Sequence, residues 1–285
     1  MLLSILRLLA RLPLSWLHAA GAALGWMVYV LSPTYARRLT DNLYSSGLCA
    51  GPDAFRKLRN QVIAETGKGV TELIAVWFGT DQKVSRMIRC DTWGVAEQAQ
   101  RSGCGVIFLT PHLGCFEIAG LFGAQKMPIT VMYRRPKLGW IEPLMIAGRS
   151  RWKSSVVPAN ARGVRMLYKA LARGEAVGLL PDQAPGADGG VWADFFGRPA
   201  YTMTLVARLQ KASGAAIIMA CAERLPHGRG YQVLIEPGPS ANLDEAALNR
   251  AVEALVRRYP AQYLWSYNRY KIPAGARAPT MNTER

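Results

Sequence analysis

From residue 106 onward, the chain alternates between short apolar runs and longer stretches with helical periodicity. The apolar runs contain many β-branched residues and have the length of strands, whereas the stretches between them are long enough for helices. This alternation predicts an α/β fold with a single, largely parallel mixed sheet covered by helices. The expected strands are residues 106–110, 129–133, 156–158, 176–180, 216–220 and 232–235. The expected helices are residues 116–125, 141–152, 164–172, 202–212 and 246–257, preceded by a mostly helical region at 53–102.

The amino-terminal segment is strongly apolar. Residues 12–31 carry no formal charge, and a helix of that length extends about 30 Å, the thickness of the hydrocarbon core of a bilayer. Its smaller and more polar residues share one helix face, which suits a helix lying in the membrane plane or a spanning helix packed on protein. That face contains Arg7, Arg11, Ser15, His18, Ala22, Gly25 and Tyr29. We therefore expect a membrane-associated helix, with a buried helix of a soluble protein as the alternative.

The domain organisation follows from these patterns. We expect the membrane-associated helix to occupy residues 1–38, the α/β domain residues 39–272, and a loose tail residues 273–285. A cleaved signal peptide is disfavoured, because the apolar run is too long and lacks a clear A-x-A cleavage site. Arginines flank the apolar run on both sides, so the positive-inside rule assigns it no orientation.

The formal net charge of +16 indicates anionic partners. Nucleic acid is disfavoured, because the chain has no zinc-finger spacing, no aromatic-rich ribonucleoprotein motif and no long basic helix. An anionic membrane surface, a phosphorylated lipid and an acidic carrier protein remain. The five cysteines are scattered without a C-x-x-C pair, and only three histidines occur, which disfavours a structural zinc site and fits reduced thiols.

The strongest candidate for chemistry is the pair His112 and Glu117, which follows the expected strand at 106–110. Five helical residues turn through about 500°, so the two side chains converge only if His112 lies in the loop and Glu117 on the helix. A neutral imidazole can take a proton from an attacking alcohol, and a carboxylate can fix its tautomer. A surface or helix-capping histidine is the alternative. Ligands of open α/β sheets bind at the carboxyl ends of strands, which favours the catalytic interpretation.

Two further features fit an anionic substrate. Residues 133–173 contain ten basic residues and Glu142 as their only acidic one, and arginine forks match phosphate geometry. Generic attraction to anionic lipid is the alternative. Asp182 follows an expected strand, where it can orient an arginine, position a head group or simply form a turn beside Pro181. The basic residues are Arg134, Arg135, Lys137, Arg149, Arg151, Lys153, Arg162, Arg165, Lys169 and Arg173.

Together these motifs resemble the late acyltransferases of lipid A biosynthesis, the Kdo-dependent lauroyl and myristoyl transferases related to the glycerolipid acyltransferase superfamily. The likeness runs from the apolar amino terminus to about Lys271. His112 and Glu117 match the family's His-x4-Glu motif. Arg135-Pro136 resembles its Tyr-Arg-Pro segment, although Arg134 is interposed here. The other matching segments are Gly148-Arg149-Ser150-Arg151, Pro181-Asp182-Gln183, Phe195-Phe196-Gly197 and Tyr263-Leu264-Trp265.

The resemblance implies a glycerolipid-acyltransferase-like fold and an O-acyltransferase in which His112 is the general base and Glu117 its partner. It implies substrate-binding roles for Arg149 and Asp182, and we extend the expected substrate site to Arg134, Arg135 and Arg151. The donor would be a fatty acyl chain on acidic acyl carrier protein. The acceptor would be a phosphorylated, Kdo-bearing lipid A precursor at the cytoplasmic face of the bacterial inner membrane. The resemblance implies no metal and no organic cofactor.

Two alternatives remain open from the sequence. The acceptor can be a different lipid, such as a lysophospholipid, an ornithine lipid or a glycosylated phosphatidylinositol. A protein of another class, a non-catalytic membrane-binding protein, can also keep the fold, although an intact His112/Glu117 pair disfavours it.

Overall fold

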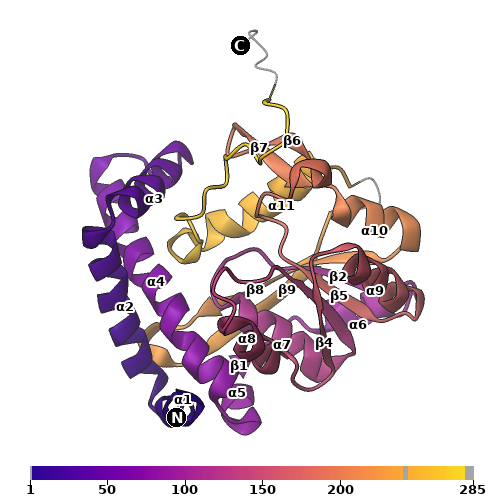
Figure 1. Ribbon diagram of the computed structural model, residues 1–285, viewed down its shortest axis with the longest axis horizontal. Coiled ribbons are helices and arrows are strands. Elements are labelled where there is room, and N and C mark those ends of the chain that lie inside the picture. The colour runs from indigo at the N-terminus through magenta and orange to yellow at the C-terminus, as the bar shows by residue number, and fades with distance from the viewer. Residues whose placement is uncertain (1, 240–242, 280–285) are drawn as a thin grey trace.

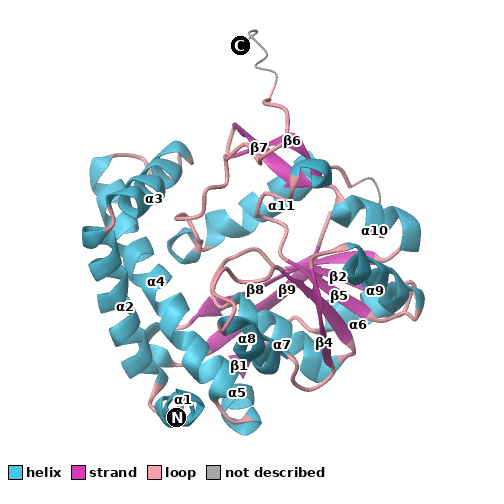
Figure 2. Ribbon diagram, in the orientation of Figure 1, coloured by secondary structure: helices cyan, strands magenta, loops and turns pink. Residues whose placement is uncertain are grey.

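The computed structural model describes residues 2–239 and 243–279. A seven-stranded sheet forms its centre, with the strand order β1-β9-β8-β2-β5-β3-β4 (Figure 2). Neighbouring strands are parallel except β8 and β9, which pair antiparallel. This confirms the predicted mixed, mostly parallel α/β sheet. The strands are β1 (Ile88–Arg89), β2 (Val106–Leu109), β3 (Ile129–Tyr133), β4 (Ser154–Pro158), β5 (Ala176–Leu179), β8 (Ala216–Arg224) and β9 (Tyr231–Pro237).

Helices cover both faces of the sheet, as its central strands require. Every residue of β2 and β5 is buried. Along β2, Ile107 and Leu109 enter one core, whereas Val106 and Phe108 enter the other, as the period-two alternation of a strand dictates. The first core contains side chains of α9 (Ala161–Ala172), α10 (Leu205–Ser213) and α11 (Glu245–Arg258). The second contains side chains of α5 (Asp81–Arg86), α6 (Gly94–Gln100) and α7 (Phe116–Lys126).

The amino-terminal segment forms several helices at one side of the molecule (Figure 1). Pro13 and Pro33 lie at its breaks, as expected for a residue that cannot donate a helical hydrogen bond. Leu14–Leu31 is long and apolar enough to cross a membrane, and only 28% of it is buried within the protein. The helices are α1 (Leu2–Leu9), α2 (Leu14–Leu31), α3 (Pro33–Ser45) and α4 (Pro52–Phe78).

Helix α2 packs along α4 through a close contact of small residues. A Cβ atom added to Gly67 would lie 2.0 Å from the carbonyl oxygen of Gly21, and one added to Gly25 would lie 2.3 Å from that of Ile63. Glycine at these positions therefore lets the two backbones approach each other. The opposite face of α2 is exposed and carries Trp16, Trp26, Met27, Val30 and Leu31.

Some elements differ from the sequence prediction. A hairpin of β6 (Gly190–Phe195) and β7 (Arg198–Met203) was not predicted, and the helix expected from residue 202 begins at Leu205 as α10. Phe196 and Gly197 both have positive φ, 49° and 70°, and form the two-residue turn that right-handed strand twist favours. The region 53–102 contains the short edge strand β1 between its helices.

The remaining elements are short. They are α8 (Ile141–Arg149) and the 3-10 turns Ala187–Gly189, Pro226–Gly228 and Pro260–Gln262. The predicted loose tail at 273–285 is described only as far as residue 279, where it has no helix or strand. Within it, the carbonyl of Arg277 accepts a hydrogen bond from the indole of Trp192 at 2.8 Å. Residues 280–285 of that predicted tail lie outside the described residues.

Candidate active site

The candidate site forms where two adjacent parallel strands end. Strand β2 ends at Leu109 and leads through Thr110 and Pro111 to His112, while β5 ends at Leu179 and leads to Asp182. Because β2 and β5 are neighbours with Leu109 opposite Leu179, the two loops emerge side by side at the same sheet edge. This register brings together His112 and Asp182, two residues 70 positions apart.

Asp182 holds His112 through two hydrogen bonds. The imidazole Nδ1 lies 2.9 Å from Asp182 Oδ1, and the His112 backbone N–H donates to Asp182 Oδ2 at 3.0 Å. The Asp182 side chain is only 2% exposed. Burial alone would raise the pKa of this carboxyl, but its electrostatic interaction and hydrogen bonds with His112 outweigh burial and lower the pKa. Asp182 is therefore a carboxylate that orients the ring.

The other ring nitrogen of His112 faces a second partner. Nε2 lies 3.0 Å from the side-chain nitrogen of Gln183, which can only donate. With Nε2 as the acceptor, Nδ1 carries the proton and donates it to Asp182. The ring of Phe116 lies 4.9 Å from the imidazole, centroid to centroid. Nε2 is thus the basic atom of the site.

Glu117 does not provide the carboxylate that the sequence analysis expected beside His112. It lies in the first turn of α7, and both of its oxygens accept from Arg149 Nε, at 3.1 and 2.9 Å; Arg149 Nη2 also bonds to Oε1. Within the described part of the chain, no hydrogen bond joins Glu117 to His112. The expected direct pairing of His112 with Glu117 is therefore wrong. Asp182, after the end of β5, provides the carboxylate that contacts His112, and Glu117 pairs instead with Arg149, the last residue of α8.

The site opens into two cavities. The wider one has a volume of about 460 Å³, within the usual range for ligand sites, and its lining includes His112, Gln183 and Arg149. Its apolar wall is Phe116, Met132, Met145, Val164, Leu179, Leu180, Met203 and Leu205. A narrow cavity of about 40 Å³ shares Phe116, Arg149, Leu179 and Leu180 with it and continues between apolar side chains of β2, β3, β5 and α7.

The other arginines expected at the site differ in whether they line one of its cavities. Arg134 lines the wide cavity and donates to the carbonyl of Ala184 at 3.4 Å. The Arg135 side chain is 76% exposed and pairs with Glu142 at 3.1 Å. Arg151 lines neither cavity; it bonds instead to the carboxylate of Asp81 and, at 2.7 Å, to the carbonyl of Val76. Of these three, the structure brings only Arg134 to the cavity wall.

The wide cavity also contains polar residues that the sequence analysis missed. Arg208 projects from α10, and Asn160 caps α9 by accepting from the backbone N–H of Gly163 at 3.0 Å. Asn160 follows the predicted strand at 156–158, so the strand-end rule that pointed to Asp182 also applies to it. Arg208 had no such signal, because it lies in a helix whose sequence position does not reveal which cavity it borders.

These observations define an α/β protein with an imidazole–carboxylate pair at the mouth of a largely apolar cavity. Across the described residues, no group of three or more His, Cys, Asp or Glu side chains is placed to hold a metal ion. The chain belongs to the bacterial lipid A biosynthesis acyltransferase family, whose model matches residues 1–272.

Individual relatives agree with this assignment. The lipid A biosynthesis lauroyltransferase of Escherichia coli (strain K12) is 29% identical over 289 residues, covering 94% of this chain and 90% of that protein. The palmitoleoyltransferase of the same pathway and strain is 28% identical over 284 residues, covering 96% and 91%. A lipid A biosynthesis acyltransferase of Haemophilus influenzae is 28% identical over 177 residues, covering 59% and 54%.

Proposed function

We propose that this acyltransferase moves a fatty acyl chain from the thioester of acyl carrier protein to a hydroxyl of a phosphorylated glycolipid, a lipid A precursor. The observation that carries the proposal is the imidazole of His112, which lines the wide cavity, is held by Asp182 at Nδ1 and has its Nε2 beside the Gln183 amide. The two Escherichia coli relatives are a lauroyltransferase and a palmitoleoyltransferase, so we expect a lauroyl or palmitoleoyl chain on the donor.

The reaction needs one base and no nucleophile from the protein. The acceptor hydroxyl replaces the Gln183 amide at His112 Nε2 and gives its proton to the ring as its oxygen attacks the thioester carbon. Asp182 stabilises the imidazolium that forms. The tetrahedral intermediate then expels the carrier's thiolate, which takes the proton back from Nε2. An ester and a free thiol result, and no metal or organic cofactor takes part.

Glu117 acts through Arg149 in this scheme. The Arg149 guanidinium borders both cavities, and its side chain is 16% exposed. Its two-oxygen contact with Glu117 fixes the plane of the guanidinium and compensates its charge. A fixed cation at this junction can stabilise the oxyanion that develops on the thioester carbonyl. Glu117 is therefore needed for transfer, although it is not the partner of the base.

The cavities suit an alkyl tail and an anionic head group. Methionines are adaptable apolar side chains, and three of them lie in the wall of the wide cavity, where we place the acyl chain. The narrow cavity takes the end of that chain. Arg134 and Arg208 line the wide cavity, where their guanidinium groups can bind a phosphate of the glycolipid. Arg135, exposed beside the site, is available to the same head group.

We place the protein at the bacterial inner membrane with the active site facing the cytoplasm. Helix α2 supports this placement by its length and by its exposed apolar face. Trp16 and Trp26 are exposed on this helix, and tryptophan side chains are common at membrane interfaces. The net charge of +16 favours both anionic inner-membrane lipid and an acidic carrier protein as partners.

The test uses purified full-length protein in detergent with acyl carrier protein loaded with chains of several lengths. A lipid A precursor, a lysophospholipid, an ornithine lipid and a glycosylated phosphatidylinositol serve as separate acceptors, and mass spectrometry identifies the product. We expect the lipid A precursor to gain one chain with the wild-type protein and none with His112→Ala. Transfer to only one of the other lipids would reject the proposed acceptor. Absence of transfer to every lipid would support a non-catalytic membrane-binding role instead.

A further inference from the structure

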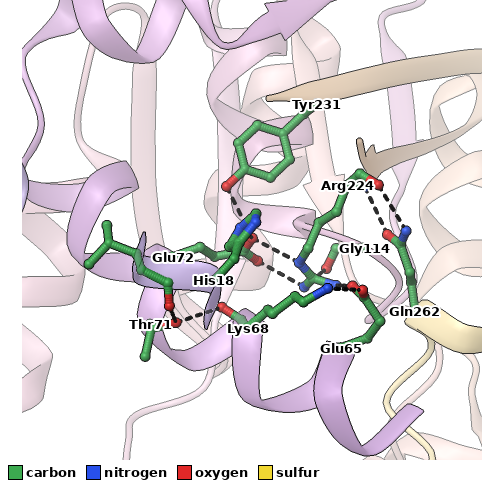
Figure 3. Close-up of polar contacts among 10 residues, drawn as sticks. His18, Glu65, Lys68, Thr71, Glu72, Gly114, Arg224, Tyr231 and Gln262 are labelled. Atoms are coloured by element: carbon green, nitrogen blue, oxygen red, sulfur yellow. Dashed lines mark hydrogen bonds and ion pairs between the residues drawn. The ribbon is translucent and has the colours of Figure 1, made fainter. Parts of the chain in front are cut away.

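A buried ionic cluster joins helix α2 to the sheet (Figure 3). At its centre, Glu72 of α4 accepts two hydrogen bonds of 2.8 Å from Arg224, the last residue of β8. His18 of α2 and the hydroxyl of Tyr231 also contact Glu72, at 3.3 and 3.0 Å. Glu65 adds a second carboxylate, 3.2 Å from Arg224. The cluster therefore links α2, α4, β8 and β9.

The charged side chains of this cluster stabilise one another in their ionised forms. Burial would raise the pKa of Glu72, but Arg224 and His18 outweigh it and lower the pKa to about 2. Burial would lower the pKa of Arg224, but the Glu72 carboxylate outweighs it and raises the pKa. Glu72 and Arg224 are 1% and 7% exposed. Such a pair is weak evidence for stability alone, because desolvating both charges costs much of what their attraction provides. A role in fixing geometry is a better explanation.

Arg224 extends this cluster to the loop that carries the catalytic histidine. Its Nη2 donates to the carbonyl of Gly114 at 2.8 Å. Gly114 lies between His112 and the start of α7, so the direction of its peptide sets where α7 begins. Gly114 has φ 59°, and a Cβ atom there would lie 2.0 Å from the carbonyl oxygen of Ala222. Only glycine fits this position, and Arg224 holds its carbonyl.

Gln262 completes the connection between Arg224 and the loop. Its side chain accepts from the Arg224 backbone N–H at 2.8 Å and donates to the Arg224 carbonyl at 3.1 Å. Its backbone carbonyl accepts from the N–H of Gly114 at 3.0 Å, and the N–H of Leu264, two residues further, donates to the carbonyl of His112 at 3.0 Å. The loop from His112 to Gly114 is thus bound on both sides by one hydrogen-bonded frame.

We propose that Arg224 is a positioning residue for acyl transfer: anchored by Glu72, which His18 also contacts, it holds the Gly114 carbonyl and thereby fixes His112 and Glu117 relative to each other. The inference rests on the proposed function of His112. It gives α2 a role beyond membrane attachment, because His18 makes this helix part of the frame that orients the active-site loop. A misplacement of about 1 Å at such a loop can cost about 100-fold in rate.

The experiment compares Arg224→Lys, Arg224→Gln and Gln262→Met in the full-length protein. Thr71→Val is the matched control, because Thr71 neighbours Glu72 and donates to the Leu17 carbonyl of α2 at 2.7 Å without contacting the loop. We measure kcat and KM for both substrates, thermal unfolding, and hydrogen exchange of the amides from His112 to Glu117. We expect Arg224→Gln to lower kcat about 100-fold with KM changed less than about threefold, and Arg224→Lys to recover part of the loss.

Exchange of the Gly114 and Cys115 amides should rise in the Arg224 variants and stay at the wild-type level in Thr71→Val. If Arg224→Gln does not fold, Gln262→Met carries the test, since it loosens the frame and leaves the Arg224–Glu72 ion pair in place. The inference is overturned if folded Arg224 or Gln262 variants keep the wild-type kcat, or if Thr71→Val loses as much kcat as they do. The wild-type rate in the same assay separates this failure from that of the proposed function, because a wild type without transfer rejects the latter.

Discussion

His112 is held from both sides of its ring, by the carboxylate of Asp182 at Nδ1 and by the amide of Gln183 at Nε2. Each partner comes from the same loop after β5, so one short segment sets both the tautomer and the orientation of the base. Glu117 and Arg149 form a second, separate pair beside it. The site therefore contains an imidazole–carboxylate pair and a separate guanidinium–carboxylate pair, and each carboxylate has its own partner.

The arrangement around His112 predicts which ring nitrogen carries the proton. In Asp182→Asn, the amide can present its nitrogen to the ring, and the proton should move from Nδ1 to Nε2. We expect nitrogen NMR of histidine-labelled protein to show Nδ1–H for His112 in the wild type and a loss of that form in Asp182→Asn. Acyl transfer should fall by about 10²- to 10⁴-fold.

Glu117→Gln is the control for this measurement, because Glu117 contacts Arg149 and not the ring. Its His112 signal should match the wild type, although its transfer rate falls through Arg149. The chain has only three histidines, so the signals are few enough to assign by substitution. A His112 signal that changes in Glu117→Gln and not in Asp182→Asn would restore Glu117 as the partner of the base.

The buried Glu72 predicts a pH dependence of stability. Its pKa falls from 4.5 to about 2 on folding, so the native state holds this group deprotonated where the unfolded chain would take up a proton. The stabilisation is complete above the unfolded pKa of 4.5 and is lost as pH falls toward 2. We therefore expect the difference in unfolding free energy between wild type and Glu72→Gln to narrow between pH 5 and about 2.5. A difference that stays constant over this range would contradict the ionised, paired state of Glu72.

At the scale of elements, α2 and α4 depend on glycine for their contact. A methyl group at Gly67 would lie 2.0 Å from the Gly21 carbonyl, so Gly67→Ala must push the helices apart. Overpacking of this kind costs about 1–3 kcal/mol. Gly94→Ala in α6 is the control, since a Cβ atom there meets nothing within 4 Å. In detergent, the Tm of thermal unfolding should be clearly lower for Gly67→Ala than for the wild type and nearly unchanged for Gly94→Ala. Equal Tm values for the two variants would contradict the close packing of α2 on α4.

Most strands of the central sheet were predictable because they are apolar or β-branched runs of strand length, and most of these runs are separated by helix-length segments. Strand β1 was not, since its two residues, Ile88 and Arg89, form no pattern and pair only at the sheet edge. The β6–β7 hairpin was also missed, because its turn places Phe196, a bulky residue, at positive φ. Local sequence does not indicate such a turn when an unusual residue occupies it.

The residues of the site were largely predictable, but their partners were not. His112 and Asp182 were both found from their places after apolar strands, whereas their contact spans 70 positions and depends on β5 lying next to β2. Strands β3 and β4 intervene in the sequence between them, so adjacency along the chain points to the wrong neighbour. Glu117 is five residues from His112 and was therefore the obvious partner by sequence distance. The strand order instead places Asp182, after β5, next to His112, after β2.

Across the whole molecule, the largest excess of basic over acidic residues lies in the segment 133–173, several residues of which line the wide cavity. In the segment 133–173, four arginines have carboxylate partners: Arg135, Arg149, Arg151 and Arg173. Among the described residues, no ion pair forms with the other six, Arg134, Lys137, Lys153, Arg162, Arg165 and Lys169. These charges are available to an acidic carrier or an anionic membrane.

This surface predicts a salt dependence. Exposed charges are screened over about 10 Å at 0.1 M salt and about 3 Å at 1 M, so the KM for acyl carrier protein should rise with ionic strength. Replacing Arg162, Arg165 and Lys169 on α9 together by glutamine should flatten that rise and leave kcat within about twofold. The matched control removes Arg86, Arg89 and Arg101 from α5, β1 and the end of α6. Equal effects of the two triple variants would reject a specific role for the basic segment.

The role of His112 as the base is tested by the single-turnover rate of acyl transfer in His112→Ala at saturating donor and acceptor, with donor binding measured separately. We expect the rate to fall at least about 100-fold, since proton transfer by a positioned base contributes about 10²- to 10⁴-fold, while the Kd for acyl carrier protein stays unchanged. A rate within a few-fold of the wild type, with product of the same structure, would contradict His112 as the base.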